Sequence, residues 1–250
     1  MNVFRDAAVT GTKKVYEIQA LYNNDSTLEF VIQPDGDYIF PNEIYLIFSV
    51  EIDKNYLMDN QGDKFFDSVE VILNNEKVSS RSNTSEYFLS SCFRTKANYG
   101  HDHYLGELRP AGWFGPLNVG TTAILAQANK TTIKERTLYE KKNNSNVLVS
   151  RIYNYSMQIN SPIFQQMKPL PSGVCIHINF KRSKQQIALI KITTNADTTY
   201  DNKQITLVNP YLEVTSLTSD KLHKKLDFTK KGSINYPIEE DCVRTFTIDD

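Results

Sequence analysis

The sequence predicts an all-β fold: an antiparallel two-sheet sandwich of jelly-roll type, with one or two short helices in the connections. About eight segments alternate apolar with polar residues, as strands with one buried face do. Their connections are uneven in length, and no strand–helix–strand repeat occurs, which disfavours a parallel sheet, a propeller or a meander. The 14 Tyr and 13 Phe residues, against a single Trp, are also typical of sheets.

The first two strands are predicted at residues 28–33 and 44–52. Leu28, Phe30 and Ile32 share one face of the first strand. On the second strand, one face holds Ile44, Leu46, Phe48, Val50 and Ile52. Turn chemistry at Pro34-Asp35-Gly36-Asp37 separates the two strands, and the polar residues 53–64 form a loop after them.

The segment 65–100 predicts a strand, a hairpin turn and a helix. Val69, Val71 and Leu73 alternate with polar neighbours, and Asn74-Asn75 tolerates the positive φ of a tight hairpin. Asn83 and Glu86 have the spacing of a capping box, and Gly100 is suited to close the helix. The apolar residues at helical spacing are Phe88, Leu89, Cys92 and Phe93.

The second half of the chain predicts further strands around a long polar segment. Periodicity fades from His101 to Asn146, where Arg109 to Pro116 reads as a structured loop. Strands are expected at residues 153–159, 174–180, 187–192, 205–214 and 242–248, the fourth bent at Pro210. Ser219 is suited to cap a short helix.

These elements predict a single jelly-roll domain over residues 1–250. We expect residues 1–25 to form an N-terminal arm, residues 101–150 a long loop excursion, and residues 216–250 a helix and the last strand. The sandwich seam is expected to hold Phe30, Leu46, Val71, Tyr155 and Ile178.

Composition favours no particular partner. The net charge of −1 gives no electrostatic reason to expect nucleic acid or an anionic membrane. Cys92, Cys175 and Cys242 are far apart and odd in number, which favours a reducing compartment over a disulfide framework. The N-terminus shows no apolar signal-peptide core, and no apolar run approaches the roughly 20 residues that span a bilayer.

Two residue groups were weighed as sites of chemistry. His101 and His103, with Cys92 or Glu107, have ligand types that bind a metal, but a polar loop is the preferred interpretation. Cys175 and His177 share a strand face and resemble a thiolate–imidazole pair. We prefer Cys175 packed in the sandwich and His177 partly solvated, because no third orienting group is identifiable.

Three other groups were weighed in the same way. The basic clusters are Lys181-Arg182-Ser183-Lys184 and the lysines at 221, 224, 225, 230 and 231. Phosphate contact is possible for them, but solvated turns explain them as well. Trp113 and Phe114 suit a sugar platform, although a loop anchor is preferred. Glu239-Glu240-Asp241 are consecutive, so their side chains diverge, and we assign no catalytic, cofactor-binding or metal residue.

Short motifs in a fixed order give the chain a family resemblance. They are E-F-V-I-Q-P-D-G-D-Y-I, N-E-I-Y-L-I-F-S-V-E-I, F-F-D-S-V-E-V-I-L-N-N, S-N-T-S-E-Y, S-P-I-F-Q-Q-M-K-P-L-P-S-G-V-C-I-H-I-N-F-K-R-S, N-P-Y-L-E-V and I-N-Y-P-I-E-E-D-C-V-R-T-F-T-I. From about Leu28 to Ile248 the chain resembles the N-terminal half of the double jelly-roll major capsid proteins of Polinton (Maverick) elements, adintoviruses and virophage-like relatives. None of these motifs is catalytic.

The resemblance implies a structural, non-enzymatic function. Its members hold two jelly rolls, form trimers with a pseudo-hexagonal outline and tile an icosahedral shell, whereas this chain has the length of roughly one jelly roll. We therefore expect a capsid subunit that binds itself as a homotrimer, contacts neighbouring capsomers and minor capsid proteins, and lies in the virion without a secretory signal. The alternative is a lectin-like or attachment module that recognises a ligand through its loops, and an enzyme using Cys175 and His177 is a remote third option.

Overall fold

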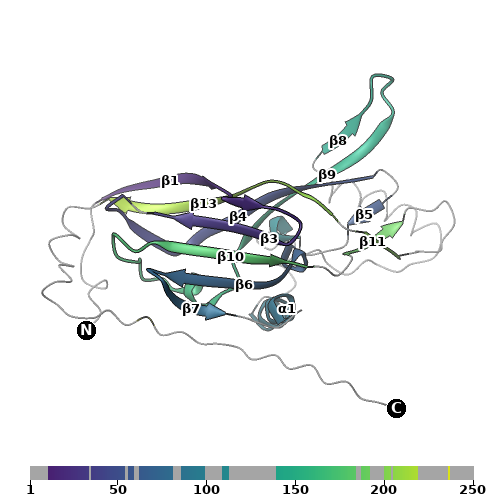
Figure 1. The fold of residues 1–250 in the computed structure, drawn as a ribbon. Helices are drawn as coiled ribbons and strands as arrows, with labels where there is room; N and C mark the ends of the chain where they lie inside the picture. The colour runs from purple at the N-terminus through teal and green to yellow at the C-terminus, as the bar shows by residue number, and fades with distance from the viewer. Residues whose placement is uncertain are drawn as a thin grey trace, which may run out of the picture.

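A computed structural model of the chain describes residues 11–33, 35–53, 56–58, 62–80, 86–98, 109–112, 139–183, 187–191, 200–203, 205–218 and 236. Within these residues two five-stranded sheets face each other, and a smaller three-stranded sheet extends from one end of the sandwich (Figure 1). Every strand pair is antiparallel. The predicted all-β jelly-roll sandwich is therefore confirmed.

Sheet A is built from strands far apart in sequence. Its order is β1 (Thr12–Gln19), β13 (Leu207–Thr218), β4 (Tyr38–Asp53), β9 (Leu148–Gln158) and β8 (Tyr139–Lys142). β4 is the long central strand, with 16 residues whose inward side chains alternate along its length. β13 bends through a register shift between Val208 and Tyr211, where Asn209 has a φ of 48° and Pro210 removes a backbone donor, as its sequence predicts.

Sheet B completes the sandwich. Its order is β2 (Tyr22–Asn23), β3 (Thr27–Ile32), β10 (Ile176–Arg182), β6 (Phe66–Leu73) and β7 (Glu76–Ser80). The β6–β7 hairpin turns at Asn74 and Asn75, whose φ values of 47° and 73° confirm the predicted tight turn. The small third sheet joins β12 (Tyr200–Lys203), β11 (Ile187–Lys191) and β5 (Tyr56–Met58).

The core lies between the two sheets, as the alternation predicts. Ile178 of β10 is in register with Phe30 of β3 and Val71 of β6, and Leu46 faces them from sheet A's inner side. These residues and Tyr155 belong to one buried cluster, and each exposes 3% or less of its surface. Phe48 of β4 stacks on Tyr155 of the same sheet at 5.0 Å, and it joins the two layers by meeting Phe66 of β6 edge-on at 6.0 Å.

Short helices close the sandwich. They are η1 (Gly62–Phe65), α1 (Glu86–Asn98), η3 (Arg109–Ala111) and η4 (Pro162–Gln165). The α1 helix confirms the expected helix, but its predicted apolar face is wrong at Phe93, which is 65% exposed, while Leu89 and Cys92 are partly buried and the burial of Phe88 lies outside the description. Among the helix residues whose burial is described, the buried ones are Tyr87, Ser90, Ser91 and Thr95, which follow the helical repeat of three to four residues. The capping residue Asn83 and the closing residue Gly100 lie outside the described residues.

Three expected boundaries need correction. The expected arm at residues 1–25 contains β1, whose Tyr16 and Ile18 pack on the core opposite Val214 and Leu212. The expected loop excursion at residues 101–150 contains β8 and the start of β9, which pair as a hairpin. The expected C-terminal region at residues 216–250 begins inside β13, which runs on to Thr218 because β1 pairs with it there.

Beyond Thr218 only Tyr236 is described. Its ring packs against the core, and its hydroxyl donates to the Pro169 carbonyl oxygen at 2.8 Å. Burial raises the pKa of Tyr236 to about 12. The helix expected after Ser219 and the strand expected at residues 242–248 lie outside the described residues.

Candidate assembly surfaces

The residues weighed as a metal site are not brought together in the part of the chain that the structure describes. Cys92 is partly buried on α1, and His101, His103 and Glu107 lie outside the described residues. Among the described residues no group of three or more His, Cys, Asp and Glu side chains is arranged to hold an ion.

Among the described residues no hydrogen bond joins the Cys175 thiol to the His177 imidazole. Ile176 and Ile178 point into the core, so their neighbours Cys175 and His177 are directed to the outer side of sheet B. The expected core packing of Cys175 is therefore wrong, since the residue is only half-buried. The imidazole Nε2 of His177 contacts instead the carboxylate of Glu29 on the neighbouring strand β3. The His177 side chain is 33% exposed, so its expected partial solvation is confirmed.

The basic cluster at residues 181–184 separates into two environments. Lys181 is exposed, but Arg182 is 6% exposed and donates to two backbone carbonyl oxygens, those of Asn24 at 3.1 Å and Ile205 at 2.6 Å. Burial lowers the pKa of Arg182, against the opposing effect of the Asp25 charge. Arg182 therefore ties β10 to the β2–β3 turn and to the residue pair just before β13, so neither a phosphate contact nor a solvated turn describes it.

The remaining weighed residues fall outside the described part of the chain. They are Trp113, Phe114, Lys184, the lysines at 221, 224, 225, 230 and 231, and Glu239-Glu240-Asp241. The sugar-platform and phosphate-contact interpretations that depend on them therefore stay predictions.

Asp63 is a buried carboxyl that sequence reasoning missed. It lies in η1, is 5% exposed, and accepts a hydrogen bond from the Ser91 hydroxyl of α1. Burial raises its pKa to about 6, although hydrogen bonds from Ser91 and Tyr87 act in the opposite direction. A raised carboxyl pKa is a property of many catalytic acids. Here the two hydroxyl partners come from one helix, so the contact docks α1 onto η1.

The outer face of sheet A carries aromatic and aliphatic side chains beside two carboxylates. The register places Glu17 of β1 opposite Glu213 of β13, which in turn lies opposite Tyr45 of β4. One row further along, Tyr211 lies opposite Ile47. We call these five residues, with Val15 and Val208, the sheet A face; Val15 is 59%, Tyr45 37% and Val208 36% exposed.

Glu17 and Glu213 are like charges in directly opposed positions. Such a pair is unfavourable by itself, and neither carboxylate has an ion-pair partner within the described residues. Tyr211 lies beside both: burial is the main cause that raises its pKa, and the charges of Glu17 and Glu213 add to it. The sheet A face therefore combines apolar area with uncompensated negative charge.

The carboxylates on the outer face of sheet B already have partners. Glu29 contacts the His177 imidazole Nε2, and Glu70 accepts from Lys77 Nζ at 2.5 Å. The two carboxylates at the centre of this face are thus engaged within the same sheet.

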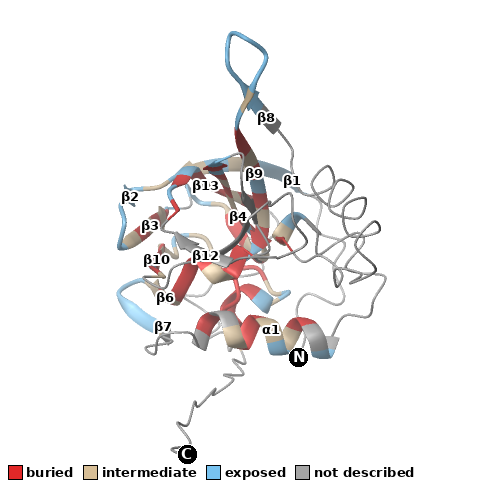
Figure 2. Ribbon diagram, turned by 90° about the vertical axis from the view of Figure 1, so that its right-hand side faces the viewer, coloured by how far each residue is buried: buried red, intermediate tan, exposed pale blue. Residues whose placement is uncertain are grey.

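The β8–β9 hairpin projects beyond the end of the sandwich and is exposed at its tip (Figures 1 and 2). The Asn143 side-chain oxygen accepts from the backbone nitrogens of Ser145 at 3.0 Å and Val147 at 2.9 Å, which shapes the turn. At its base Glu51 of β4 accepts from the Ser150 hydroxyl at 2.5 Å and from Lys141 Nζ at 3.2 Å. These contacts hold the hairpin in line with sheet A.

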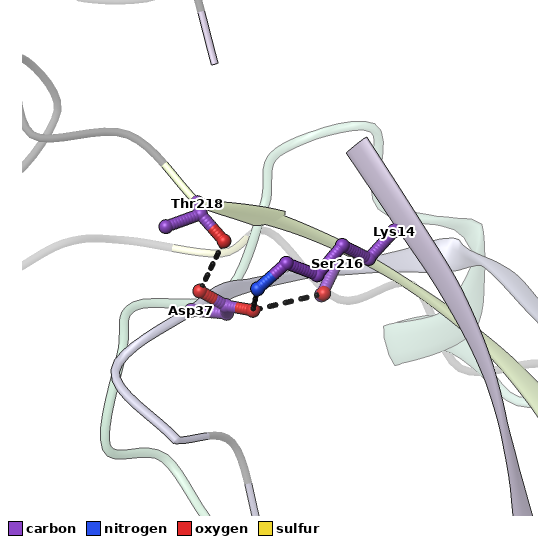
Figure 3. A network of polar contacts seen from close by, with 4 residues as sticks. All are labelled: Lys14, Asp37, Ser216 and Thr218. Carbon is purple, nitrogen blue, oxygen red and sulfur yellow. Dashed lines mark hydrogen bonds and ion pairs between the residues drawn. The ribbon is translucent and has the colours of Figure 1, made fainter. Parts of the chain in front are cut away.

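A polar cluster fixes the other end of sheet A. Asp37, at the start of β4, accepts from the Thr218 hydroxyl at 2.6 Å and the Ser216 hydroxyl at 3.2 Å, and lies 3.6 Å from Lys14 Nζ of β1 (Figure 3). Burial acts to raise the Asp37 pKa, but the two hydroxyls and Lys14 together hold that pKa below its usual value. We call these four residues the Asp37 clamp; it joins β1, β13 and the β3–β4 connection.

Comparison with solved structures finds a similar fold in two viral structures. The chain is similar to a structure from the Sputnik virophage determined by cryo-electron microscopy at 3.5 Å, with a TM-score of 0.58, 11% identity, and coverage of 85% of this chain and 49% of that chain. It is also similar to the PBCV-1 VP54 structure fitted into a reconstruction of Sputnik, with a TM-score of 0.50, 12% identity, and coverage of 90% and 46%.

At 11 and 12% identity the likeness shows the class of fold alone, a jelly-roll sandwich that also occurs in those viral structures. The chain spans about half the length of those two chains. No family model and no curated protein sequence matches it. Among the described residues no helix is long and apolar enough to cross a membrane.

Proposed function

We propose that the chain is a structural subunit of a viral or virus-derived capsid, which assembles with copies of itself into a shell and performs no catalysis. The observation that carries the proposal is the match over 85% of the chain to the Sputnik structure with a TM-score of 0.58. A sandwich shows only a fold by itself, so the surfaces must supply the rest of the argument.

The surfaces support a role in self-association. The structure places exposed apolar side chains on the sheet A face and on the projecting hairpin, and such patches mark contact surfaces when they are contiguous. Three described ionisable groups, Arg182, Asp63 and Asp37, hold elements of the fold together.

The finer proposal follows the family resemblance of the sequence. We place the chain with the Polinton, adintovirus and virophage-like capsid proteins, as a single-domain sandwich that forms trimers, contacts minor capsid proteins and lies in the virion. Because the chain spans about half of its structural neighbours, a complete pseudo-hexagonal capsomer requires a second sandwich for each copy. Contact with packaged nucleic acid is expected to be weak and non-specific at the net charge of −1.

Negative-stain electron microscopy with size-exclusion chromatography of the purified chain tests this proposal. We expect trimers or larger regular particles whose proportion rises with protein concentration. A matched control is Ile178→Asp, which places a charge in the fully buried seam and removes the assembled species with the fold. A monodisperse monomer that retains a bound ligand would instead support the attachment-module alternative.

A further inference from the structure

We propose that the β8–β9 hairpin of one copy docks on the sheet A face of a second copy. The inference rests on the proposed function, because it names the contact by which the subunits assemble. The observations that carry it are an aliphatic run on the hairpin beside a lysine, and an apolar face with two carboxylates on sheet A, none of these three charges having an ion-pair partner within the described ranges.

The hairpin presents three consecutive aliphatic residues, Val147, Leu148 and Val149. Val147 is 50% and Val149 45% exposed, and Leu148 is half-buried. The pairing shifts between Lys141 and Lys142, so that Lys141 lies opposite Ser150 and Lys142 opposite Leu148, which leaves Val149 as the bulged residue. A bulge re-aims a side chain, and a run of exposed apolar residues is unfavourable unless a partner covers it. Residues 147–149 of the hairpin are therefore suited to burial by another surface.

Charge identifies the complementary surface. On the hairpin Lys141 is engaged by Glu51, whereas Lys142 has no acidic partner among the described residues. On the sheet A face Glu17 and Glu213 face each other across two strands. A lysine delivered between them relieves their mutual repulsion, while Tyr45 and Val208 cover the valines.

The outer face of sheet B is a poorer receiver. Its carboxylates Glu29 and Glu70 are already paired with His177 and Lys77. A lysine docking there would compete with existing partners and gain little net attraction. The unpaired carboxylates thus distinguish the two faces of the same sandwich.

The receiving face must belong to another copy. The hairpin extends in line with sheet A and away from the sandwich in both views, held by the contacts of Glu51 at its base (Figures 1 and 2). Since the hairpin and the sheet A face are different surfaces, each copy gives one contact and receives one. Such head-to-tail contacts close into rings or continue as an extended array.

Charge reversal tests the pairing. We expect Lys142→Glu and Glu17→Lys each to weaken self-association by at least about tenfold, because each places like charges at the contact. The double variant Lys142→Glu, Glu17→Lys restores association to within about threefold of the wild-type value. Both positions are exposed, so the fold is retained, and circular dichroism checks this. Lys181→Glu, at an exposed lysine of sheet B, is the matched control and leaves association unchanged.

Cross-linking tests the geometry independently. A copy carrying Val149→Cys is mixed with a copy carrying Tyr45→Cys under mild oxidation, and mass spectrometry identifies the linked peptides. The expected product joins residues 149 and 45 between copies, and a control copy with Asn179→Cys on the outer side of sheet B gives no such link.

The outcomes separate this inference from the proposed function. If the wild-type chain assembles but neither charge reversal nor cross-linking affects or captures the contact, the hairpin contact is wrong and the capsid proposal stands. If the wild-type chain stays monomeric at every concentration, both are wrong. Restoration by the double variant together with the 149–45 link supports both.

Discussion

Arg182→Ala tests whether a single buried side chain holds the two sheets together at one end. Arg182 donates to the carbonyl oxygens of Asn24 at 3.1 Å and Ile205 at 2.6 Å; Asn24 lies in the β2–β3 turn and Ile205 lies just before β13. Hydrogen bonds from a charged donor contribute about 1.5 to 3 kcal/mol each, so the two together contribute about 3 to 6 kcal/mol. Removing the buried charge also removes its desolvation penalty, so the free energy of unfolding is expected to fall by a net amount of about 2 to 4 kcal/mol.

The assay is urea unfolding followed by tryptophan and tyrosine fluorescence, with a thermal scan beside it. A loss of about 2 to 4 kcal/mol corresponds to a fall in Tm of roughly 4 to 16 °C for a chain of this size. Lys181→Ala, at the exposed neighbouring position, is expected to change stability by less than about 0.5 kcal/mol. Arg182→Met keeps the aliphatic packing but not the donors, and is expected to lose nearly as much as the alanine variant. Equal stability of Arg182→Ala and Lys181→Ala would refute the reasoning.

Three further predictions concern ionisable groups and the tight turn. The Asp37 pKa lies below its usual value of 3.8 in the folded chain, so the stability that the carboxylate contributes is present above pH 3.8 and is lost as the pH falls through the folded pKa. Asp37→Asn is therefore expected to lower Tm at roughly pH 6. A difference in Tm between variant and wild type that persists undiminished at roughly pH 2 would contradict the clamp with Thr218. The Asp63 pKa is raised from 3.8 to about 6, so the stability that the protonated carboxyl contributes is fully present below pH 3.8 and is lost as the pH rises through about 6. Asp63→Asn keeps an acceptor for Ser91 and is expected to unfold with a free energy about 1 to 3 kcal/mol higher than wild type at roughly pH 8. A less stable variant in urea titrations at that pH would count against the burial argument. Asn75 has a φ of 73°, so Asn75→Gly is expected to keep or slightly raise Tm, whereas Asn75→Val is expected to lower the free energy of unfolding by about 1 to 2 kcal/mol. Equal Tm values for the two variants would be incompatible with this turn.

Strands buried on one face were predictable from the sequence. Leu28, Phe30 and Ile32 alternate with more polar neighbours, and in the structure the three are fully buried on β3. The hairpin at Asn74 and Asn75 was equally readable, because few residue types accept two consecutive positive φ values. In both cases local chemistry and tertiary structure demand the same conformation.

The strands that were missed lack this alternation for a physical reason. β1 buries only part of one face; residues 12–15, which include two lysines, are exposed and show no alternation of apolar with polar residues. β8 is short, and its last two residues, Lys141 and Lys142, are exposed in a projecting hairpin. Such strands form because a neighbouring strand offers its hydrogen-bonding edge, and that information lies elsewhere in the chain.

The polar contacts were beyond sequence reasoning for a different reason. Ser90, Ser91 and Thr95 look solvent-facing by composition, yet they form the buried side of α1. Asp63 and Arg182 likewise look like surface charges until partners 28 and 23 residues away are brought to them. A buried polar group is stable only with its partner, and no spacing rule identifies a partner at such separations. The uncompensated pair Glu17 and Glu213 became visible only once the β1–β13 register was known.

Sedimentation velocity of the 28.7 kDa chain over a hundredfold concentration range tests the central claim most directly. Self-assembly into a capsid lattice predicts a boundary that moves from a slow species to trimers and larger species as concentration rises. A single slow boundary with the coefficient of one 28.7 kDa chain at every concentration would contradict it.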